Sequence, residues 1–288
     1  MTGQSDGDPR ALLLSRRDFD RVANFVNGHA GILLPPVKKA MVEGRLRRRV
    51  RALGFADFRS YCTYVFQQEG LAHEGDFIID AITTNKTDFF REPDHFHFLA
   101  ETVLPQLGLV ERIGLGGEPL QIWSAAASIG AEAYSLAMGA ADFALQHKAF
   151  RFTVLGTDIC SEVLTRAVTA IYPEEMVTPV PAAMRQRYLM RSRDRALAEV
   201  RIVPELRQRV TFARQNLNEP VYAVPKTIHV VFCRNMLIYF DKVMQEAVLS
   251  RICNCLLPGG YLFIGHSETV AGFSLPLRQV APTIFLRL

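Results

Sequence analysis

Apolar residues recur at helical spacing in the early part of the chain. Within the segment KKAMVEGRLRRRVRAL, residues 38–53, four of them lie three or four positions apart, which places them on one stripe of a helix. The residues of this stripe are Val42, Leu46, Val50 and Leu53. The pattern predicts a helical domain over about residues 15–80, with this stripe facing its core.

The positions between these apolar residues are strongly basic. Residues 38–53 contain seven cations against the single Glu43. One interpretation is a helix face that is simply exposed to water, as most charged faces are. The alternative is an acidic partner that docks on this helix, because the cationic excess is larger than solubility requires.

Beyond residue 80, short apolar runs alternate with helical segments. The predicted strands are 121–124, 152–158, 228–233 and, after a turn at Pro258-Gly259-Gly260, 261–265. The predicted helices are Glu132–Gln146, Ser161–Thr169 with Ser161 as its N-cap, and about Lys242–Leu256. This alternation is typical of an α/β fold, in which helices cover both faces of a parallel sheet.

The stretch Arg185–Gln215 breaks the alternation. It holds three short extended segments, Tyr188–Arg191, Val200–Val203 and Val210–Arg214, around the charged loop RSRDRALAE. The simplest interpretation is a small antiparallel β-subdomain. The alternative, a β-α-β-like piece of the main sheet, stays open.

Composition narrows the class of protein. The chain has 288 residues, of which 49% are hydrophobic and 22% charged, so we expect a folded protein of about two domains rather than a disordered or fibrous one. A net charge of +4 neither requires nor excludes nucleic acid. The five scattered cysteines indicate reduced, mostly buried thiols. The chain shows no signal peptide and no apolar run of about 18 residues, so we expect a cytoplasmic location without membrane insertion.

The turn SAAASIG, residues 124–130, offers free helix N–H donors and small side chains that let a ligand approach. It is a weak nucleotide motif because it lacks the three glycines of G-x-G-x-x-G and the Walker lysine. Asp158 follows Gly130 by 28 residues, at the end of the next strand, where a carboxylate can accept hydrogen bonds from ribose hydroxyls. The alternative role of Asp158 is to cap the following helix.

Other polar residues lie beside this turn. Glu132 stands in the first helical turn, where it either stabilises the helix dipole or binds a cationic ligand. The segments 83–93 and 233–241 gather polar residues before the sheet and at the end of a buried strand. His95 and His97 are predicted to be ordinary surface histidines, and no metal site is expected.

Six ordered motifs carry a family resemblance: TTNKTDFFREPDHF, IWSAAASIGAEAYSLAM, LGTDIC, FARQNL, VFCRNMLIYFD and LLPGGYLFIGHSE. Over roughly residues 28–284 the chain resembles the CheR family of chemoreceptor glutamate methyltransferases, and GILLPPVKKAMVEGRLRRRVRALG resembles the helical domain of that family. The family transfers a methyl group from S-adenosylmethionine (SAM) to glutamates on the cytoplasmic helical bundle of methyl-accepting chemotaxis proteins, and S-adenosylhomocysteine is the product.

The resemblance implies a basic receptor-docking domain over residues 12–82 and a Rossmann-like SAM-dependent methyltransferase domain over residues 83–288, with the β-subdomain at about 185–215. It implies that Arg91 and Tyr239 face the transferred methyl as catalytic residues. The implied donor-binding residues are Asn85, Thr87, Arg91, Glu132, Asp158, Asn216, Leu217, Arg234 and Asn235, and the implied docking residues are Arg45, Arg48 and Arg49.

Two positions depart from the family pattern. Ile129 stands where threonine is frequent, and Ala131 stands where many members have glutamate or glutamine. In some members the β-subdomain grips a pentapeptide at the receptor C-terminus. The loop RSRDRALAE lacks the glycines associated with those members, so dependence on such a tether is open.

The implied chemistry needs neither a general base nor a metal, because a glutamate with a pKa of about 4.3 is already ionised at neutral pH. Two rival functions are kept. The first is a methyltransferase of this fold that acts on a small molecule or RNA, although no aromatic residue lies within Arg45–Arg51 to stack on bases. The second is a donor-binding regulatory module without catalysis.

Overall fold

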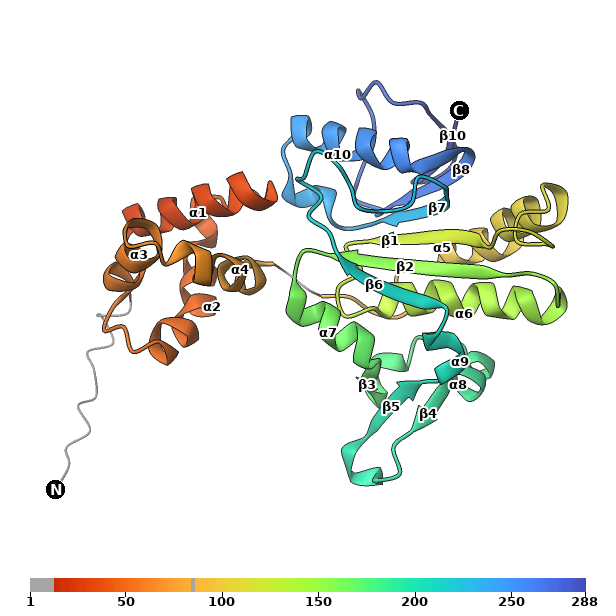
Figure 1. Cartoon of the computed structure of the whole chain (residues 1–288), viewed down its shortest axis with the longest axis horizontal. Coiled ribbons are helices and arrows are strands. Elements are labelled where there is room, and N and C mark those ends of the chain that lie inside the picture. The colour runs from red at the N-terminus through yellow and green to blue at the C-terminus, as the bar shows by residue number, and fades with distance from the viewer. Residues whose placement is uncertain (1–12, 84–85) are drawn as a thin grey trace. The chain divides into compact units, whose positions relative to one another are not determined.

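The computed structural model describes residues 13–83 and 86–288, which form two compact units divided between Thr84 and Asn85 (Figure 1). Each unit has its own core. No helix within the described residues is long and apolar enough to cross a membrane.

The first unit is helical, as predicted. Its helices are α1 (Arg16–Ala30), α2 (Lys39–Ala52), α3 (Phe58–Gln67) and α4 (Leu71–Ile82), with a short 3-10 turn, η2 (Pro36–Lys38), before α2. Ser15 and Asp57 cap α1 and α3 by accepting backbone N–H groups with their side chains. Val42, Leu46 and Val50 are fully buried, which confirms most of the predicted stripe. Leu53 is 39% exposed because α2 ends at Ala52.

The second unit is built on a seven-stranded sheet in the order β6-β2-β1-β7-β8-β10-β9 (Figure 1). The strands from β6 to β8 are parallel, and β10 pairs antiparallel with both β8 and β9. Their bounds are β1 (Leu120–Ala125), β2 (Phe152–Asp158), β6 (Val210–Arg214), β7 (Ile228–Cys233), β8 (Leu256–Ile264), β9 (Leu277–Ala281) and β10 (Ile284–Arg287). The order reverses between β1 and β7, and in open parallel sheets ligands bind outside the strand ends at such a point.

Helical segments cover this sheet. They are α5 (Pro93–Phe98), η3 (Leu99–Val103), η4 (Gln106–Val110), α6 (Ala131–Gln146), α7 (Ser161–Thr169), η7 (Leu237–Tyr239) and α10 (Lys242–Cys255). Val230 and Phe232 of β7 share one hydrophobic cluster with α6 and η3. All six residues of β7 are buried, so both faces of this strand are covered, as the continuous apolar run predicts.

A second, three-stranded antiparallel sheet has the order β3-β5-β4 (Figure 1). Its strands are β3 (Ile171–Pro173), β4 (Leu189–Arg191) and β5 (Glu199–Ile202), accompanied by η5 (Glu174–Val177), α8 (Ala182–Tyr188), η6 (Arg195–Leu197) and α9 (Pro204–Arg207). The predicted β-subdomain is thus confirmed for two of its three segments. It is wrong for Val210–Arg214, which is β6 and pairs parallel with β2 in the main sheet.

Two boundaries differ from the sequence prediction. Ser161 is the first residue of α7, so Cys160 is the N-cap and no side chain caps the helix. The predicted turn at 258–260 lies inside β8, where the pairing with β7 shifts register between Ile228 and Val230. The glycines there accommodate this irregularity within the strand, so they do not end it.

Candidate functional site

Four parallel strands end at the same edge of the sheet. Ala125 of β1 lies opposite both Thr157 of β2 and Cys233 of β7, and Asp158 lies opposite Arg214 of β6. The residues that follow these strands are therefore assembled at one place. Most of the sequence-predicted site residues of the second unit follow these strands.

The turn after β1 has an unusual backbone. Ala126, Ser128 and Gly130 all have positive φ angles, of 64°, 51° and 88°. Left-handed conformations at non-glycine residues cost free energy and tend to cluster at binding sites. A Cβ at Gly130 would lie 3.0 Å from the Ala167 Cβ, so this tight contact and the positive φ both favour glycine there. The two departures from the family pattern, Ile129 and Ala131, are buried.

Asp158 is fixed by two backbone amides. Its Oδ2 accepts the Ser128 N–H at 2.9 Å and its Oδ1 accepts the Cys160 N–H at 3.0 Å. The side chain therefore holds the turn after β1 and the start of α7 together. The capping role left open by the sequence is not formed, because the accepted N–H is that of Cys160, which precedes α7, and α7 has no side-chain cap. The carboxylate is held in place beside the turn after β1, with the residue 7% exposed.

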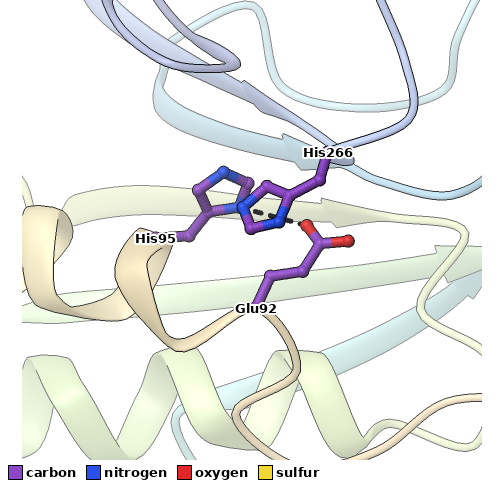
Figure 2. A group of neighbouring side chains, drawn as sticks. All are labelled: Glu92, His95 and His266. Carbon is purple, nitrogen blue, oxygen red and sulfur yellow. Dashed lines mark ion pairs between the residues drawn. The ribbon is translucent and has the colours of Figure 1, made fainter.

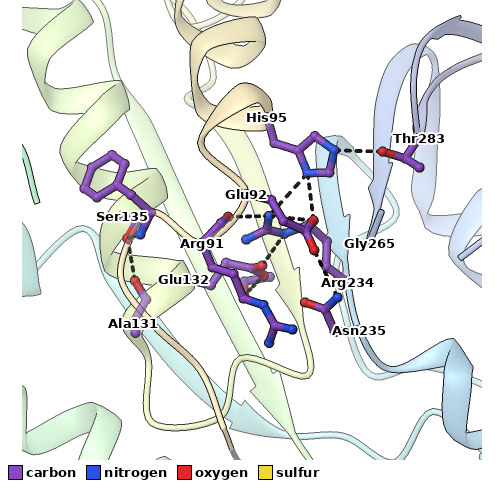
Figure 3. A network of polar contacts seen from close by, with 12 residues as sticks. Arg91, Glu92, His95, Ala131, Glu132, Ser135, Arg234, Asn235, Gly265 and Thr283 are labelled. Carbon is purple, nitrogen blue, oxygen red and sulfur yellow. Dashed lines mark hydrogen bonds and ion pairs between the residues drawn. The ribbon is translucent and has the colours of Figure 1, made fainter. Parts of the chain in front are cut away.

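Glu132 and Arg234 form a buried ion pair in which the Arg234 Nε donates to the Glu132 Oε2 at 2.7 Å. The Ser124 hydroxyl donates to the other carboxylate oxygen of Glu132 at 2.7 Å. Arg234 also donates through Nη1 to the Arg91 carbonyl oxygen at 2.7 Å (Figure 3). The arginine side chain is 2% exposed, and this set of partners offsets the cost of burying its charge.

A histidine completes this network. The Arg234 Nη1 lies 3.2 Å from the His95 Nδ1, and because arginine only donates, Nδ1 is the acceptor. The proton of His95 is then on Nε2, which donates to the Thr283 hydroxyl at 2.9 Å. Burial and the charge of Arg234 lower the pKa of His95 to about 4. The prediction of a surface residue is wrong for His95, which is 1% exposed, and is confirmed for His97.

Glu92, His95 and His266 bring one ligand atom each to within 4.8 Å of one another (Figure 2). Such a group resembles a metal site. Here, however, the Arg234 Nη1 already donates to the Glu92 Oε2 at 3.3 Å and to the His95 Nδ1. A guanidinium cation thus already donates to two of the three side chains of this group.

The loop after β7 is anchored by Glu268, which sequence reasoning missed. The Glu268 carboxylate accepts the N–H groups of Asn235 at 3.0 Å and Leu237 at 2.7 Å, together with that of Gly265 at 2.6 Å. Burial raises the pKa of Glu268, although these backbone donors favour its charged form. The one sequence signal was its place in the last motif, FIGHSE, directly after a buried strand.

The loop after β6 is organised by Gln215, a second missed residue. Its Oε1 accepts the Ala223 N–H at 2.7 Å and its Nε2 donates to the Asn216 carbonyl oxygen at 3.0 Å. The Tyr222 hydroxyl donates to the Leu217 carbonyl oxygen at 2.8 Å. Asn216 and Leu217 are therefore held at the same sheet edge as Asp158.

Comparison with known proteins agrees with this arrangement. The family model described as "CheR methyltransferase, SAM binding domain" matches residues 85–285, and "CheR methyltransferase, all-alpha domain" matches residues 17–83. The chain belongs to the CheR methyltransferase family. It is 41% identical over 257 residues to the chemotaxis protein methyltransferase of Salmonella typhimurium, covering 89% of this chain and 85% of the relative.

Two further relatives are also similar to this CheR protein over most of their length. The chemotaxis protein methyltransferase of Escherichia coli is 39% identical over 259 residues, with 89% of this chain and 86% of the relative covered. Chemotaxis protein methyltransferase 2 of Pseudomonas aeruginosa is 36% identical over 271 residues, with 94% and 93% covered. This CheR protein is therefore a methyltransferase, and its second unit is a SAM-binding domain.

The remaining predicted site residues of this CheR protein are less tightly held. Arg91 is half-buried and donates to the Lys86 carbonyl oxygen at a long 3.4 Å. Tyr239 is half-buried at the end of η7, and no hydrogen bond or ring contact among residues 86–288 joins it to Arg91. Thr87 is half-buried, and Asn85 lies outside the described residues.

The basic helix α2 carries two kinds of arginine. Arg45 donates to the carbonyl oxygens of Ile82 at 2.6 Å and Thr83 at 3.0 Å at the end of α4. Arg49 forms a two-point ion pair with the buried Glu74, at 2.7 and 2.9 Å, and stacks 3.6 Å over the Phe77 ring. Arg48 is exposed. Two of the three predicted docking residues therefore hold the helical unit together.

Proposed function

We propose that this CheR protein transfers a methyl group from SAM to glutamate side chains on the cytoplasmic domains of chemoreceptors, giving methyl esters. One observation carries the proposal. The Asp158 carboxylate, which backbone amides hold in place, and the Glu132–Arg234 ion pair lie at the same edge of the sheet. The similarity to chemotaxis protein methyltransferases, over most of the length of each relative, supports the choice of a chemoreceptor as the methyl acceptor.

The residues present fit SAM. Asp158 is oriented by backbone amides and suits ribose hydroxyls, and the glycine at 130 lets the start of α6 pack closely against Ala167 and Phe212. We assign Glu132, Arg234 and Asn235 to the methionine end. Asn216 and Leu217, together with Thr87 and Asn85, complete the proposed donor site.

The bound donor supplies a methyl group on a positively charged sulfur. The acceptor glutamate is ionised at neutral pH, so its oxygen attacks the methyl carbon without a general base. Alignment of the reacting groups lowers the barrier, by up to about 7 to 11 kcal/mol in well-oriented systems. We assign that alignment to Arg91 and Tyr239, which orient the incoming carboxylate. The reaction neutralises two charges, so exclusion of water favours it.

We place receptor docking on the exposed cations of the basic helix and the turn before it. These are Lys38, Arg48 and Arg51. Arg45 and Arg49 contribute by holding α2 to α4. The small sheet β3-β5-β4 is the proposed place of a receptor tether, if this receptor uses one.

Transfer of labelled methyl from SAM to a purified chemoreceptor cytoplasmic fragment tests the proposal. Alkali treatment of the labelled receptor should release methanol, which identifies a carboxyl methyl ester. Removal of the last five receptor residues should lower the rate where a tether operates. SAM binding without transfer to any of several receptors would contradict the proposed acceptor and favour the regulatory module.

A further inference from the structure

Asn235 is held between two carboxylates. Its backbone N–H donates to the Glu268 Oε2 at 3.0 Å. Its side-chain Nδ2 donates to the Glu92 Oε1 at 3.1 Å (Figure 3). Glu92 belongs to a turn 143 positions earlier in the chain. Its other oxygen accepts from the Arg234 Nη1 at 3.3 Å. Glu92 therefore links the side chains of two neighbouring residues in the proposed donor site.

The bond to Glu92 decides which way the Asn235 amide points. An ionised carboxylate only accepts hydrogen bonds, so the NH₂ group of Asn235 must face it. Burial raises the pKa of Glu92, but the Asn235 hydrogen bond and the charge of Arg234 outweigh this effect and the pKa is lowered overall. Glu92 is therefore ionised at neutral pH. The amide carbonyl of Asn235 is directed away from it.

This carbonyl oxygen has no hydrogen-bond partner among residues 13–83 and 86–288, and Asn235 is half-buried. Asn235 directly follows Arg234, whose Nε donates to Glu132, so it lies at the proposed methionine end. The methionine end of the donor carries an ammonium group, which only donates, and a carboxylate, which only accepts. A carbonyl oxygen therefore matches the ammonium group.

We propose that Glu92 is a positioning residue that orients the Asn235 amide, so that its carbonyl oxygen accepts a hydrogen bond from the ammonium group of the methyl donor. This inference rests on the proposed function. Both residues of this contact have strained backbones, since the φ angles of Glu92 and Asn235 are 59° and 57°. Gly265 allows it, since a Cβ there would lie 2.5 Å from the Asn235 Nδ2.

The substitution Glu92→Gln should reverse the orientation. Arg234 is the stronger donor, so it would keep the amide oxygen of the new side chain and leave the amide NH₂ facing Asn235. The Asn235 amide would then turn to offer its own oxygen, and its NH₂ group would face the donor. Two donor groups would meet at the ammonium.

Calorimetry with three ligands tests the proposal. They are S-adenosylhomocysteine, its analogue without the amino group (S-adenosyl-4-thiobutyrate) and its analogue without the carboxylate (S-adenosyl-3-thiopropylamine). Glu92→Gln should weaken binding of the two ammonium-bearing ligands about tenfold, the scale of a lost hydrogen bond to a charged group. Binding of the analogue without the amino group should change less than about twofold.

Asn235→Gly tests the same contact by removing the amide itself, and glycine tolerates the positive φ at this position. This variant should also weaken binding of the two ammonium-bearing ligands more than binding of the analogue without the amino group. In that background Glu92→Gln should add no further change, because Glu92 acts through Asn235. Glu101→Gln, an exposed carboxylate on η3, is the matched control, and thermal unfolding checks that each variant is folded.

The outcomes separate the inference from the proposed function. An equal loss for all three ligands, or no loss for S-adenosylhomocysteine, would overturn the role of Glu92 while the donor site stands. Failure of the unaltered protein to bind S-adenosylhomocysteine would overturn both.

Discussion

The Nε of Arg234 lies 2.7 Å from the Glu132 Oε2, and this bond joins the end of β7 to the first turn of α6. The two residues are 102 positions apart in the chain. Both are buried, so each is the main reason that the other can be charged inside the protein. The pair shapes the donor site and at the same time contributes to the stability of the second unit.

Removal of the arginine should therefore be costly. We expect Arg234→Ala to lower the free energy of unfolding by about 3 to 5 kcal/mol, because Glu132 would be left as an unpaired buried charge. Urea unfolding measures this. Arg278→Ala is the matched control, since that arginine is exposed on β9 and its loss should cost less than about 0.5 kcal/mol. A loss below about 1 kcal/mol for Arg234→Ala would show that water reaches Glu132.

His95 should make stability depend on pH. Its pKa is about 4 in the folded protein against 6.5 for a free histidine, so the unfolded chain binds more protons between these values. The contribution of neutral His95 is fully present above pH 6.5 and is lost as the pH falls towards 4. We expect a loss of about 3 kcal/mol over this window.

The unfolding free energies of the unaltered protein and of His95→Gln are compared at each pH. Their difference isolates the contribution of His95, because all other groups titrate in both proteins. The difference in unfolding free energy should fall steadily as the pH is lowered from about 7 to 4. His97→Gln should follow the unaltered protein, since His97 is exposed. A difference that stays constant with pH would mean that His95 titrates normally.

Local pattern was sufficient for much of the fold. The strands at 152–158 and 228–233 and the helix at 161–169 have the predicted bounds, because each is a short element set by its own apolar run. Val210–Arg214 was misassigned. Its burial pattern is broken by exposed residues, and only its pairing with β2 identifies it as a strand of the main sheet.

The sequence predicted those site residues whose side-chain type and position beside a strand end both indicate ligand binding. Asp158 and Glu132 stand beside the strand-to-helix turn, and position alone indicates them. Glu92 and Glu268 were missed since their partner, Asn235, lies 143 and 33 positions away. The interaction of Arg49 with Glu74, 25 positions away, was missed for the same reason. Such pairings are formed by tertiary packing, which spacing along the chain does not reveal.

Asp158→Ala should weaken donor binding. The carboxylate is assigned to the ribose hydroxyls, and loss of such a contact is expected to cost roughly 1 to 3 kcal/mol. Calorimetry with S-adenosylhomocysteine measures it. This substitution also removes the Asp158 oxygen that accepts the Ser128 N–H in the turn after β1. Asp158→Asn keeps one oxygen acceptor and should give a smaller loss, and unchanged affinity in both variants would remove the assignment.

Charge reversal on the basic helix should separate docking from folding. Arg48 is exposed, so Arg48→Glu should leave the free energy of unfolding within about 0.5 kcal/mol of the unaltered protein. It should lower receptor methylation at low salt, and the defect should shrink as salt rises, because a screened attraction matters less. Donor binding should not change.

Arg49→Glu is the matched contrast on the same helix. It would place a carboxylate against Glu74, which is 2% exposed, and remove the stacking on Phe77. We expect it to destabilise the helical unit by about 3 to 5 kcal/mol, because a buried charge would lose its partner. Thermal unfolding of both variants, run beside methylation assays at two salt concentrations, decides between the roles. Equal methylation by Arg48→Glu and the unaltered protein at low salt would mean that the exposed face of α2 is only hydrated and does not dock the receptor.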